Sequence, residues 1–471
     1  MELAGRHAVL PQRIVLDAST LPDIQFDIGS FSAAPVTLND GGGTITAAMP
    51  PLHTVFVTAK LNRTPTRADQ QNLSNALATI EAAYPFSAAA IITFIAYGIP
   101  YFNRLPGALT GSLVSSHMPR LLSDTSRFAL EEAVPAPTDV SSANPGITKQ
   151  TFNVPVRIES NDLLITVRGD NSSYISDVLN WLGGSNTLKG NPVTSPSLFR
   201  GLATVTSSRA QFVGISLPRL TAADQGFSYA DEINPDSPMW MGFLDQQTNG
   251  AGPAAITTFA GNSSARLTTA VPGDYFDNGS IQHLSHVIED LAQFYARPSA
   301  SDSEGEPFTE RVQYMFRSNP IPSTGNADQF TNSGGPSIFP DAFQGTGDAL
   351  ANAQGVSTFQ GEHRLGHLSC LQRSSRAADT TPIHMRMDGP GYDSMDVPDG
   401  SNQPKLQFTI FVPTASFFTT LRINQASLDL QNAHGVDPSD NGLERFLTAT
   451  RRQNFLIPPR RNRAFPLVEL T

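Results

Sequence analysis

The first 100 residues contain one clear change of hydrophobic period. Residues 52–61, "LHTVFVTAKL", alternate between apolar and polar positions, as expected for a strand. Residues 68–84 instead carry Leu73 and Leu77 at helical spacing, and residues 89–98 are almost wholly apolar, which predicts a second, buried strand. The sequence therefore predicts a strand-helix-strand unit here.

The same pattern occurs again further along the chain. Residues 162–170, "DLLITVRGD", predict a strand, and residues 172–184 predict a helix that ends at a pair of glycines. The pieces "RGLATVTS" and "RAQFVGISL" complete the second unit. Two β-α-β units with antiparallel neighbours favour a ferredoxin-like α+β domain over about residues 50–235.

A second copy of this plan is predicted in the C-terminal half. Residues 279–296 predict a strand that runs into a helix, and residues 405–430 repeat that layout. Between these copies, residues 297–404 are rich in Gly, Ser, Pro and Asp and show little periodicity. Loops of this length in a compact domain are usually functional or disordered, and the histidines of this one favour function.

The predicted organisation has three parts. Residues 1–50, with the turn "NDGGGT" at 39–44, predict an irregular arm that wraps a domain. Residues 51–238 form an N-terminal ferredoxin-like domain, and residues 239–471 a C-terminal one that contains the long loop 297–404. The predicted fold class is α+β, with two ferredoxin-like domains and antiparallel sheets.

Composition narrows the function classes. The chain has 471 residues, 39% of them hydrophobic, which is enough for a sizeable core. Its formal net charge of −11 disfavours nucleic-acid binding, because phosphate contacts need a broad basic surface. The single cysteine excludes an internal disulfide framework and any cysteine-based zinc or iron–sulfur site.

No membrane or export segment is recognisable. The most apolar run, residues 88–102, is too short to span a bilayer and contains Gly98 and Pro100. The opening residues lack a basic head followed by an apolar core and a cleavage site. We expect a soluble protein in the cytoplasm, with export of a longer precursor left open.

The long loop holds the most suggestive chemistry, "GEHRLGHLSCLQRSSR" at 361–376. His363 and His367 could chelate zinc from one helical face, but Gly361 and Gly366 disfavour a helix there. Cys370 could be a thiolate ligand of haem iron, although a buried, inert cysteine is the more common case.

Another candidate lies in "WMGFLDQQTNG" at 240–250, where Asp245 precedes a glycine-rich turn. Judged alone, Asp245 is best explained by ordinary turn chemistry. Trp240, five residues before it, is a candidate electron relay, although buried aromatic residues are usually part of a core.

Taken in order, these stretches resemble the haem-binding set of dye-decolourising peroxidases. The resemblance rests on a G-x-x-D turn ending at Asp245, on His367 before an arginine-rich stretch, and on Arg386 in "PIHMRM" before the glycine turn "DGPGY". That family has two ferredoxin-like domains in one chain, of the dimeric α/β-barrel type, with the haem in the C-terminal half. The sequence departs from the family where Gln246 replaces the final glycine of the motif.

The resemblance implies a role for each matching residue. His367 would be the axial ligand of haem b, Asp245 the distal acid and Arg386 the distal arginine. These types suit the chemistry, because imidazole binds haem iron, a carboxylate can carry the proton of peroxide, and a cation stabilises the departing oxygen. Further cofactor-binding candidates are Arg373, Arg376, His384 and the arginines of 451–463.

Three functions remain open at the level of the sequence. The first is a haem peroxidase that oxidises an organic reductant with hydrogen peroxide. The second is a haem enzyme of the same fold with a dedicated biosynthetic reaction, which Gln246 and Gln247 beside the distal acid would suit. The third is a binding module without a cofactor, and a homo-oligomer is compatible with each of them.

Overall fold

The computed structural model describes residues 15, 21–27, 36–40, 43–47, 50–233, 235, 237–241, 257–261, 266–296, 384–426 and 442–471. Near the N-terminus, β1 (Val36–Asp40) and β2 (Gly43–Ala47) pair antiparallel on either side of the glycine-rich stretch where the sequence predicts a turn. All of the larger strands, in contrast, belong to one ten-stranded sheet.

The first half of this sheet is formed by two strand-helix-strand units. Its elements are β3 (His53–Leu61), α1 (Arg67–Ala83), β4 (Ile92–Tyr97), β6 (Leu163–Gly169), α4 (Ser172–Leu182) and β9 (Ala203–Phe212). The hydrogen-bonded order is β4-β6-β3-β9, with every neighbouring pair antiparallel. This order is that of a ferredoxin-like domain.

The helices form where the sequence supplies caps and one apolar face. Thr66 caps α1 by accepting a hydrogen bond from the backbone N–H of Asp69, whose carboxylate accepts one from the N–H of Thr66 in return. Asn171 caps α4, and Gly183 ends it. The apolar faces of both helices pack on β3, β4 and β6 in the main core.

The second half repeats the plan. Its elements are β10 (Ser280–Glu289), α7 (Leu291–Phe294), β11 (Met385–Arg386), β12 (Gly389–Asp393), β13 (Gln403–Val412), α11 (Ala415–Ala426) and β14 (Leu447–Ile457). The order β11-β13-β10-β14 matches that of the first half, with β12 continuing along β13. The chain therefore contains two ferredoxin-like halves in one sheet.

Short elements connect these strands and helices. They are α2 (Ile99–Arg104), α3 (Ser112–Ser115), β5 (Arg157–Ile158), β7 (Thr187–Leu188), β8 (Asn191–Pro192), a π-helical turn (Leu198–Leu202), α5 (Leu217–Asp224) and 3₁₀ turns at Ala230–Glu232, Gly442–Phe446, Arg460–Asn462 and Val468–Leu470. In the described part of the chain, every helix is too short or too polar to cross a membrane.

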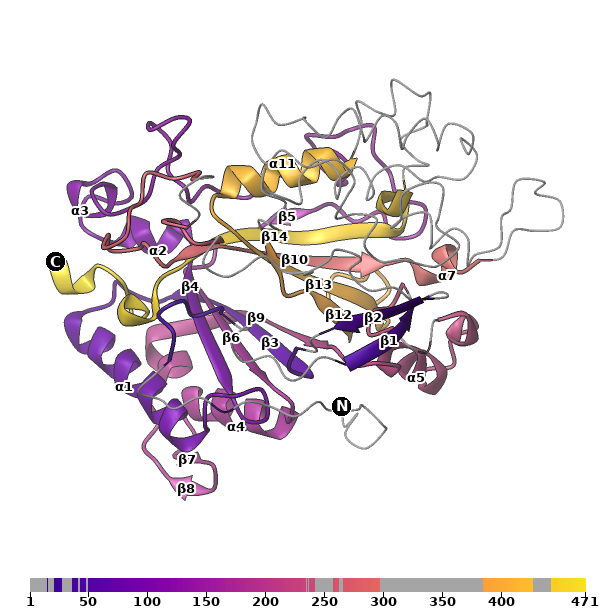
Figure 1. Cartoon of the computed structure of the whole chain (residues 1–471), viewed down its shortest axis with the longest axis horizontal. Helices are drawn as coiled ribbons and strands as arrows, with labels where there is room; N and C mark the ends of the chain where they lie inside the picture. The colour runs from indigo at the N-terminus through magenta and orange to yellow at the C-terminus, as the bar shows by residue number, and fades with distance from the viewer. Residues whose placement is uncertain are drawn as a thin grey trace.

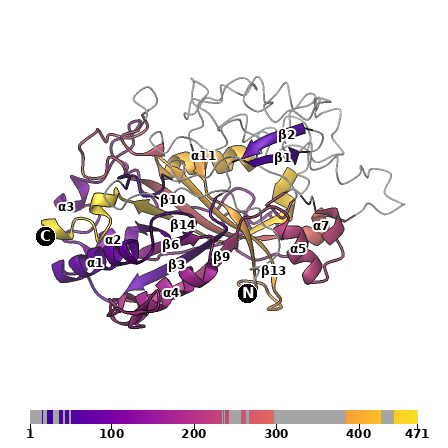
Figure 2. The ribbon, with the colours of Figure 1, turned by 60° about the horizontal axis from the view of Figure 1, so that its bottom comes forward.

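The sheet curls until its two halves face each other across a common interior, which we call the lumen. On one side β14 pairs with β4 through Leu456 and Tyr97. On the other side β12 lies against β9, where a Cβ atom on Gly391 would come within 2.9 Å of the carbonyl oxygen of Ala210. Helices α1 and α4 cover the outside of the first half and α11 covers that of the second, with the strands between them (Figures 1 and 2).

Part of the lumen is filled by apolar side chains from both halves. Phe56, Phe94 and Leu164 come from the first half, and Phe411 and Phe455 from the second. Phe26, from the segment 21–27, stacks on Phe411 with ring centroids 4.4 Å apart. The two halves thus share one core, which makes them a single closed unit.

The structure confirms the predicted fold class and corrects two local predictions. The strand β14 runs through the arginines of "RRQNFLI", which the sequence analysis treated only as a basic cluster. The "glycine turn" of "DGPGY" is the strand β12, and it needs glycine because Gly389 and Gly391 lie against β9 too closely for a side chain.

Candidate active site

The predicted site residues fall into two groups. Asp245, His367, Arg373 and Arg376 lie outside the described residues, as do His363 and Cys370. Arg386 and His384 are described and lie at β11. Met385 and Met387 both pack in the lumen, so the alternation of a strand turns Arg386 and His384 to the opposite, outer side of the sheet.

The outer side of β11 offers a mixed polar and apolar surface. Arg386 is half-buried and pairs in register with Ile410 of β13, while His384 is buried. Ile410 and the partly buried Phe408 belong to the core beneath α11. A guanidinium and an imidazole therefore lie on the same side of the sheet, next to apolar side chains.

Further along the same outer side, β10 and β14 carry a buried ion pair. The guanidinium of Arg452 donates two hydrogen bonds to the carboxylate of Asp139, at 2.7 and 2.8 Å, and a third to the hydroxyl of Ser285 at 2.8 Å. The nearby Arg452 guanidinium offsets the burial of Asp139, so the pKa of that carboxyl stays below its ordinary value.

His283 completes this outer polar group. Its Nδ1 lies 2.7 Å from Asn454 Oδ1, and its Nε2 lies 2.5 Å from Ser285 Oγ. Asn454 uses its amide N–H on the Glu131 carbonyl, so Nδ1–H of His283 donates to Asn454 and the Ser285 hydroxyl donates to Nε2. Burial and the Arg452 charge lower the pKa of His283, and Phe418 of α11 stacks on the ring at 3.8 Å.

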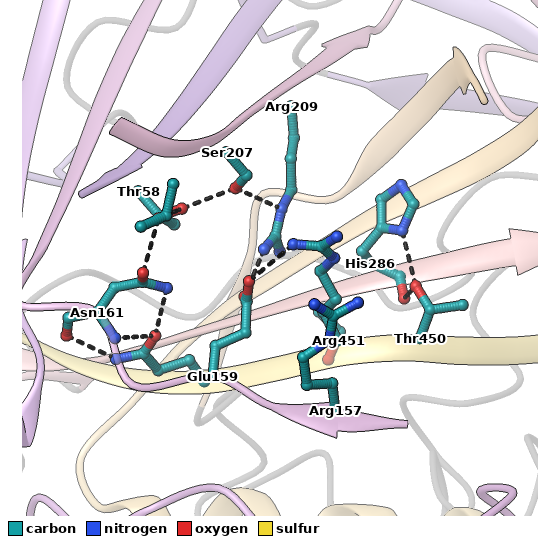
Figure 3. Close-up of polar contacts among 12 residues, drawn as sticks. Thr58, Arg157, Glu159, Asn161, Ser207, Arg209, His286, Thr450 and Arg451 are labelled. Atoms are coloured by element: carbon teal, nitrogen blue, oxygen red, sulfur yellow. Dashed lines mark hydrogen bonds and ion pairs between the residues drawn. The ribbon is translucent and has the colours of Figure 1, made fainter. Parts of the chain in front are cut away.

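A second polar network occupies the lumen (Figure 3). The carboxylate of Glu159 accepts hydrogen bonds from Arg209 of β9 and, at 3.3 Å, from Arg451 of β14. Arg451 also forms a two-pronged pair with Asp396, at 2.6 and 2.8 Å. Arg157 of β5 contacts Asp396 at 3.1 Å from a largely exposed position. The network therefore runs from the surface to the fully buried Arg209.

His286 is linked to this network through a hydroxyl. Thr450 Oγ1 lies 2.9 Å from both Asp396 Oδ2 and His286 Nδ1. An ionised carboxylate only accepts, so Thr450 donates to Asp396 and accepts from Nδ1–H of His286. The other ring nitrogen, Nε2, lies 3.4 Å from Asp393 Oδ1. Burial lowers the pKa of His286 and keeps the ring neutral.

The remaining charges of the lumen network are mutually compensating. Although burial opposes ionisation, the hydrogen bonds and charge of Arg451 hold the pKa of Asp396 at about 2. Burial lowers the pKa of Lys405 to about 8, although Asp393 lies 3.8 Å from its Nζ. Lys405 also donates a hydrogen bond of 2.8 Å to the carbonyl of Met395.

The basic cluster 451–463 has partners within the chain. Arg460 and Arg463 contact Glu81 of α1, and Arg461 contacts Asp23 and Asp277. Together with the pairs of Arg451 and Arg452, these contacts occupy every arginine of the cluster. These arginines, offered by the sequence as candidates for binding haem propionates, are thus each paired with a carboxylate of a distant segment.

Trp240 and the two histidines of β10 are buried core residues. His283 and His286 lie on opposite sides of β10 and cannot chelate together. Trp240 is fully buried and donates a hydrogen bond of 3.0 Å to the Gly391 carbonyl. Within the described ranges, no group of three or more His, Cys, Asp or Glu side chains is arranged to hold a metal ion.

No sequence motif points to the lumen network. Arg209, Glu159 and Asp393 drew no attention because they are far apart in the chain and match no motif. The only signal was polar residues at inward positions of apolar strands, such as Arg209 and Gln211 in "RAQFVGI". Without the register between strands, this signal does not show which residues meet.

Two ferredoxin-like halves that close into one curled sheet define an α+β chain of the dimeric α/β-barrel type. The chain belongs to DUF7405, a family of unknown function, whose model matches residues 51–145 and 129–459. No curated protein matches the sequence.

The chain is also similar to solved structures of dye-decolourising peroxidases. One is a putative DyP-type peroxidase from Shewanella oneidensis, with 14% identity, a TM-score of 0.46 and coverage of 90% of this chain and 96% of that chain. Another is the encapsulated DyP-type peroxidase of Mycobacterium smegmatis, with 13% identity, a TM-score of 0.44 and coverage of 88% and 94%. A DypB variant of Rhodococcus jostii RHA1 in complex with haem has 12% identity, a TM-score of 0.46 and coverage of 88% and 95%.

Proposed function

We propose that this chain is a haem-dependent, peroxidase-like oxidoreductase that uses hydrogen peroxide to oxidise an organic reductant. The observation that carries the proposal is the position of Arg386, half-buried on the outer side of the second ferredoxin-like half. The order of Asp245, His367 and Arg386 in the sequence supports it, as does the fold that the resemblance implies. A cytoplasmic location belongs to the same proposal.

A bound haem makes two demands on the residues around it. A porphyrin needs an apolar surface, and peroxide chemistry needs a cation beside the reacting oxygens. The partly buried Phe408 supplies apolar surface on the outer side of β13, and Arg386 is a cation on the same side of the sheet, on β11. The chemistry of this donor set fits haem, and we propose that His367, from the segment outside the described residues, would hold its iron.

Three residues of the chain would then have separate roles in the reaction. When bound, haem supplies a redox-active iron for the reduction of peroxide. The imidazole of His367 would hold this iron, and the carboxylate of Asp245 would move a proton from one peroxide oxygen to the other. The guanidinium of Arg386 would stabilise the negative charge on the departing oxygen, an effect typically worth about 3–4 kcal/mol.

The ligand assignment is tested by haem titration. In His367→Ala, the Soret band and stoichiometric haem binding should be lost, because the imidazole that would hold the iron is removed. The matched control is His363→Ala, four residues earlier in the same segment, which should bind haem like the wild type. Full haem binding by His367→Ala, or its loss in His363→Ala alone, would refute the assignment.

The role of Arg386 is tested by peroxide kinetics in the haem-loaded protein. Arg386→Met should slow the reaction with peroxide by about 10²–10³-fold at an unchanged haem content. Arg127→Met, which removes an exposed arginine paired only with Glu131, should react at the wild-type rate. Equal rates in Arg386→Met and the wild type would exclude Arg386 from the reaction.

A second candidate keeps the haem but changes the reaction. It is favoured by Gln246, which stands where the resemblance predicts the final glycine of the distal motif. Amide groups beside the distal acid would suit a specific nitrogenous or carbonyl substrate. A haem-loaded protein that ignores peroxide and generic dyes would favour this candidate over the peroxidase.

A further inference from the structure

On one side of the molecule the two halves of the sheet are joined by very little strand pairing. β4 pairs with β6 along one edge, whereas on its other edge the described residues give it one pair with β14, between Tyr97 and Leu456. Residues 21–27, which we call the strap, lie beside β4 just beyond that pair. The strap forms a turn, in which the N–H of Asp27 donates to the carbonyl of Ile24 at 3.3 Å. The strap thus lies at the seam between the halves.

The side-chain amide of Gln25 bridges this seam. Continued beyond Leu456, the antiparallel register would place Pro458 opposite Ile95. Proline has no N–H, so Pro458 cannot donate to the Ile95 carbonyl. Gln25 Nε2 donates instead to that carbonyl at 3.1 Å and to the Pro458 carbonyl at 2.7 Å, and Gln25 Oε1 accepts from the Ile95 N–H at 3.0 Å. The fully buried amide therefore has partners for both of its hydrogens and for its oxygen.

Phe26, the next residue of the turn, packs in the lumen. Its side chain is 1% exposed, and its ring stacks on that of Phe411 with centroids 4.4 Å apart and planes 5° from parallel. Leu21 and Ile24 pack, partly buried, against the same apolar cluster. Removing these apolar side chains from water favours binding of the strap. Phe26 is therefore its apolar anchor.

The other wall of the seam, residues 458–461, holds the strap by polar contacts. The Arg461 N–H donates to Asp23 Oδ1 at 3.0 Å, and the Arg461 guanidinium pairs with Asp23 Oδ2. Asn278 donates to the same Oδ2 at 2.9 Å. The Arg460 N–H donates to the Asp23 carbonyl at 2.6 Å. An ion pair thus adds to the contacts of the amide and the aromatic ring.

Both walls of the seam are held by contacts that do not involve the strap. β4 pairs with β6, and the hydroxyl of Tyr97 donates to the Arg463 carbonyl at 2.7 Å. Arg460 also pairs with Glu81 of α1. The strap, in contrast, adds no strand to the sheet in the part of the chain that the structure describes. Short segments without a strand ladder open locally at a lower free energy than the sheet itself, so the strap can leave a groove that stays formed.

We propose that the seam between β4 and residues 458–461 is a peptide-recognition groove, which the strap fills reversibly. Its ligand is a turn of the sequence Asp-x-Gln-Phe, whose carboxylate meets Arg461 and whose ring stacks on Phe411. The amide of the glutamine spans the backbones of Ile95 and Pro458. A second peptide of this sequence can therefore take the place of the strap. The groove does not depend on the proposed peroxidase chemistry.

The probe is a fluorescein-labelled peptide of residues 20–28, "TLPDIQFDI". Added to the full chain that carries both Gln25→Ala and Phe26→Ala, it should bind saturably in fluorescence anisotropy, because the weakened strap leaves the groove open. The wild type should bind it about tenfold more weakly or less, because its own strap competes at a high effective concentration. Gln71→Ala, at an exposed position of α1, is the matched control and should bind like the wild type.

A second peptide tests which side chains the groove recognises. With alanine in place of its glutamine and phenylalanine, the peptide should bind the double variant about tenfold more weakly or less, since it lacks the hydrogen bonds and the stacked ring. No saturable binding of the native peptide to a double variant with the far-UV circular dichroism of the wild type would overturn the proposal. Equal binding of the two peptides would overturn it as well.

Hydrogen exchange in the wild type decides the question if the double variant does not fold. The backbone N–H groups of Ile95 and Arg461 both donate to the strap. Their exchange, measured by mass spectrometry at residue resolution, should be about tenfold or more faster than that of the β6 amides, because release of the strap exposes them without unfolding the sheet. Exchange of Ile95 and Arg461 as slow as that of β6 would show that the strap leaves only on global unfolding, which would overturn the proposal.

Discussion

Glu289 is a buried carboxyl whose raised pKa should make the fold less stable as the pH rises from 5 to 8. It ends β10, is only 4% exposed, and its Oε2 has no hydrogen-bond partner in the described part of the chain. Burial, with a smaller contribution from the charge of Asp388, raises its pKa from 4.5 to about 8. The folded protein therefore holds this proton at pH 7, where an unfolded chain has released it.

The size of the effect follows from proton linkage. Between its ordinary pKa and about 8, the folded state binds the proton more tightly than the unfolded state, so rising pH favours unfolding. Each pH unit in this window costs about 1.4 kcal/mol, so the group removes about 4 kcal/mol of stability between pH 5 and pH 8. Below the ordinary pKa both states are protonated and the cost disappears.

Glu289→Gln tests this directly, because the amide resembles a protonated carboxyl and does not titrate. Its free energy of unfolding should be close to that of the wild type near pH 5 and should exceed it by about 4 kcal/mol near pH 8. Urea unfolding at pH values from 5 to 8 gives the free energy of unfolding of both proteins. The difference between the two values removes the contributions of all other titrating groups. Glu132→Gln, at an exposed position, is the matched control and should show no such trend.

A difference between wild type and Glu289→Gln that stays constant from pH 5 to pH 8 would refute this reasoning. It would mean that Glu289 is already ionised in the folded protein and has a partner that compensates its charge. A Glu289→Gln variant that is less stable than the wild type at pH 8 would refute it as well.

Three further predictions concern other buried contacts. Arg452→Met should cost about 3–5 kcal/mol in thermal unfolding because it leaves Asp139 buried without its partner, and an unchanged midpoint would contradict this. Asp396, whose pKa is lowered to about 2, stabilises the fold above its ordinary pKa of 3.8, and this contribution is lost as pH falls toward 2. Acid titration by circular dichroism should therefore show a shallower loss of structure in Asp396→Asn. Gly391→Ala should cost about 1–3 kcal/mol in urea unfolding because its Cβ meets Ala210, whereas Gly146→Ala, which has open space, should cost much less.

The fold was predictable where local periodicity matches the final environment. The strand of 162–170 runs apolar because both of its sides are buried, and that of 52–61 begins with an alternation of buried and partly buried positions. The helices carry caps and a single apolar face. Strand β14 was missed because Arg451 and Arg452 break the apolar pattern. Each of these arginines is neutralised by a carboxylate from a distant loop, and no local pattern encodes such a partner.

The candidate site also contains some residues that the sequence indicates and others that it does not. Arg386 could be chosen as a candidate from the sequence, because the residues around it resemble a haem-binding motif. The alternation of the strand then shows on which side of the sheet Arg386 lies. The lumen network could not be selected, because Arg209 and His286 approach each other only when two halves of the chain curl together. Their proximity depends on strand register over long sequence separations, which one sequence does not reveal.

The position of β14 has a consequence for how the chain folds. β14 pairs with β10 and reaches across to β4 of the first half, and shortly after it Arg463 accepts a hydrogen bond from Tyr97, 366 residues earlier. Contacts over such separations form late because closing the long loop between them has a large entropic cost. During synthesis the first half can fold on its own, whereas β10 cannot pair with β14 until β14 has left the ribosome. Until then β10, which is buried along its whole length in the folded chain, is exposed to solvent.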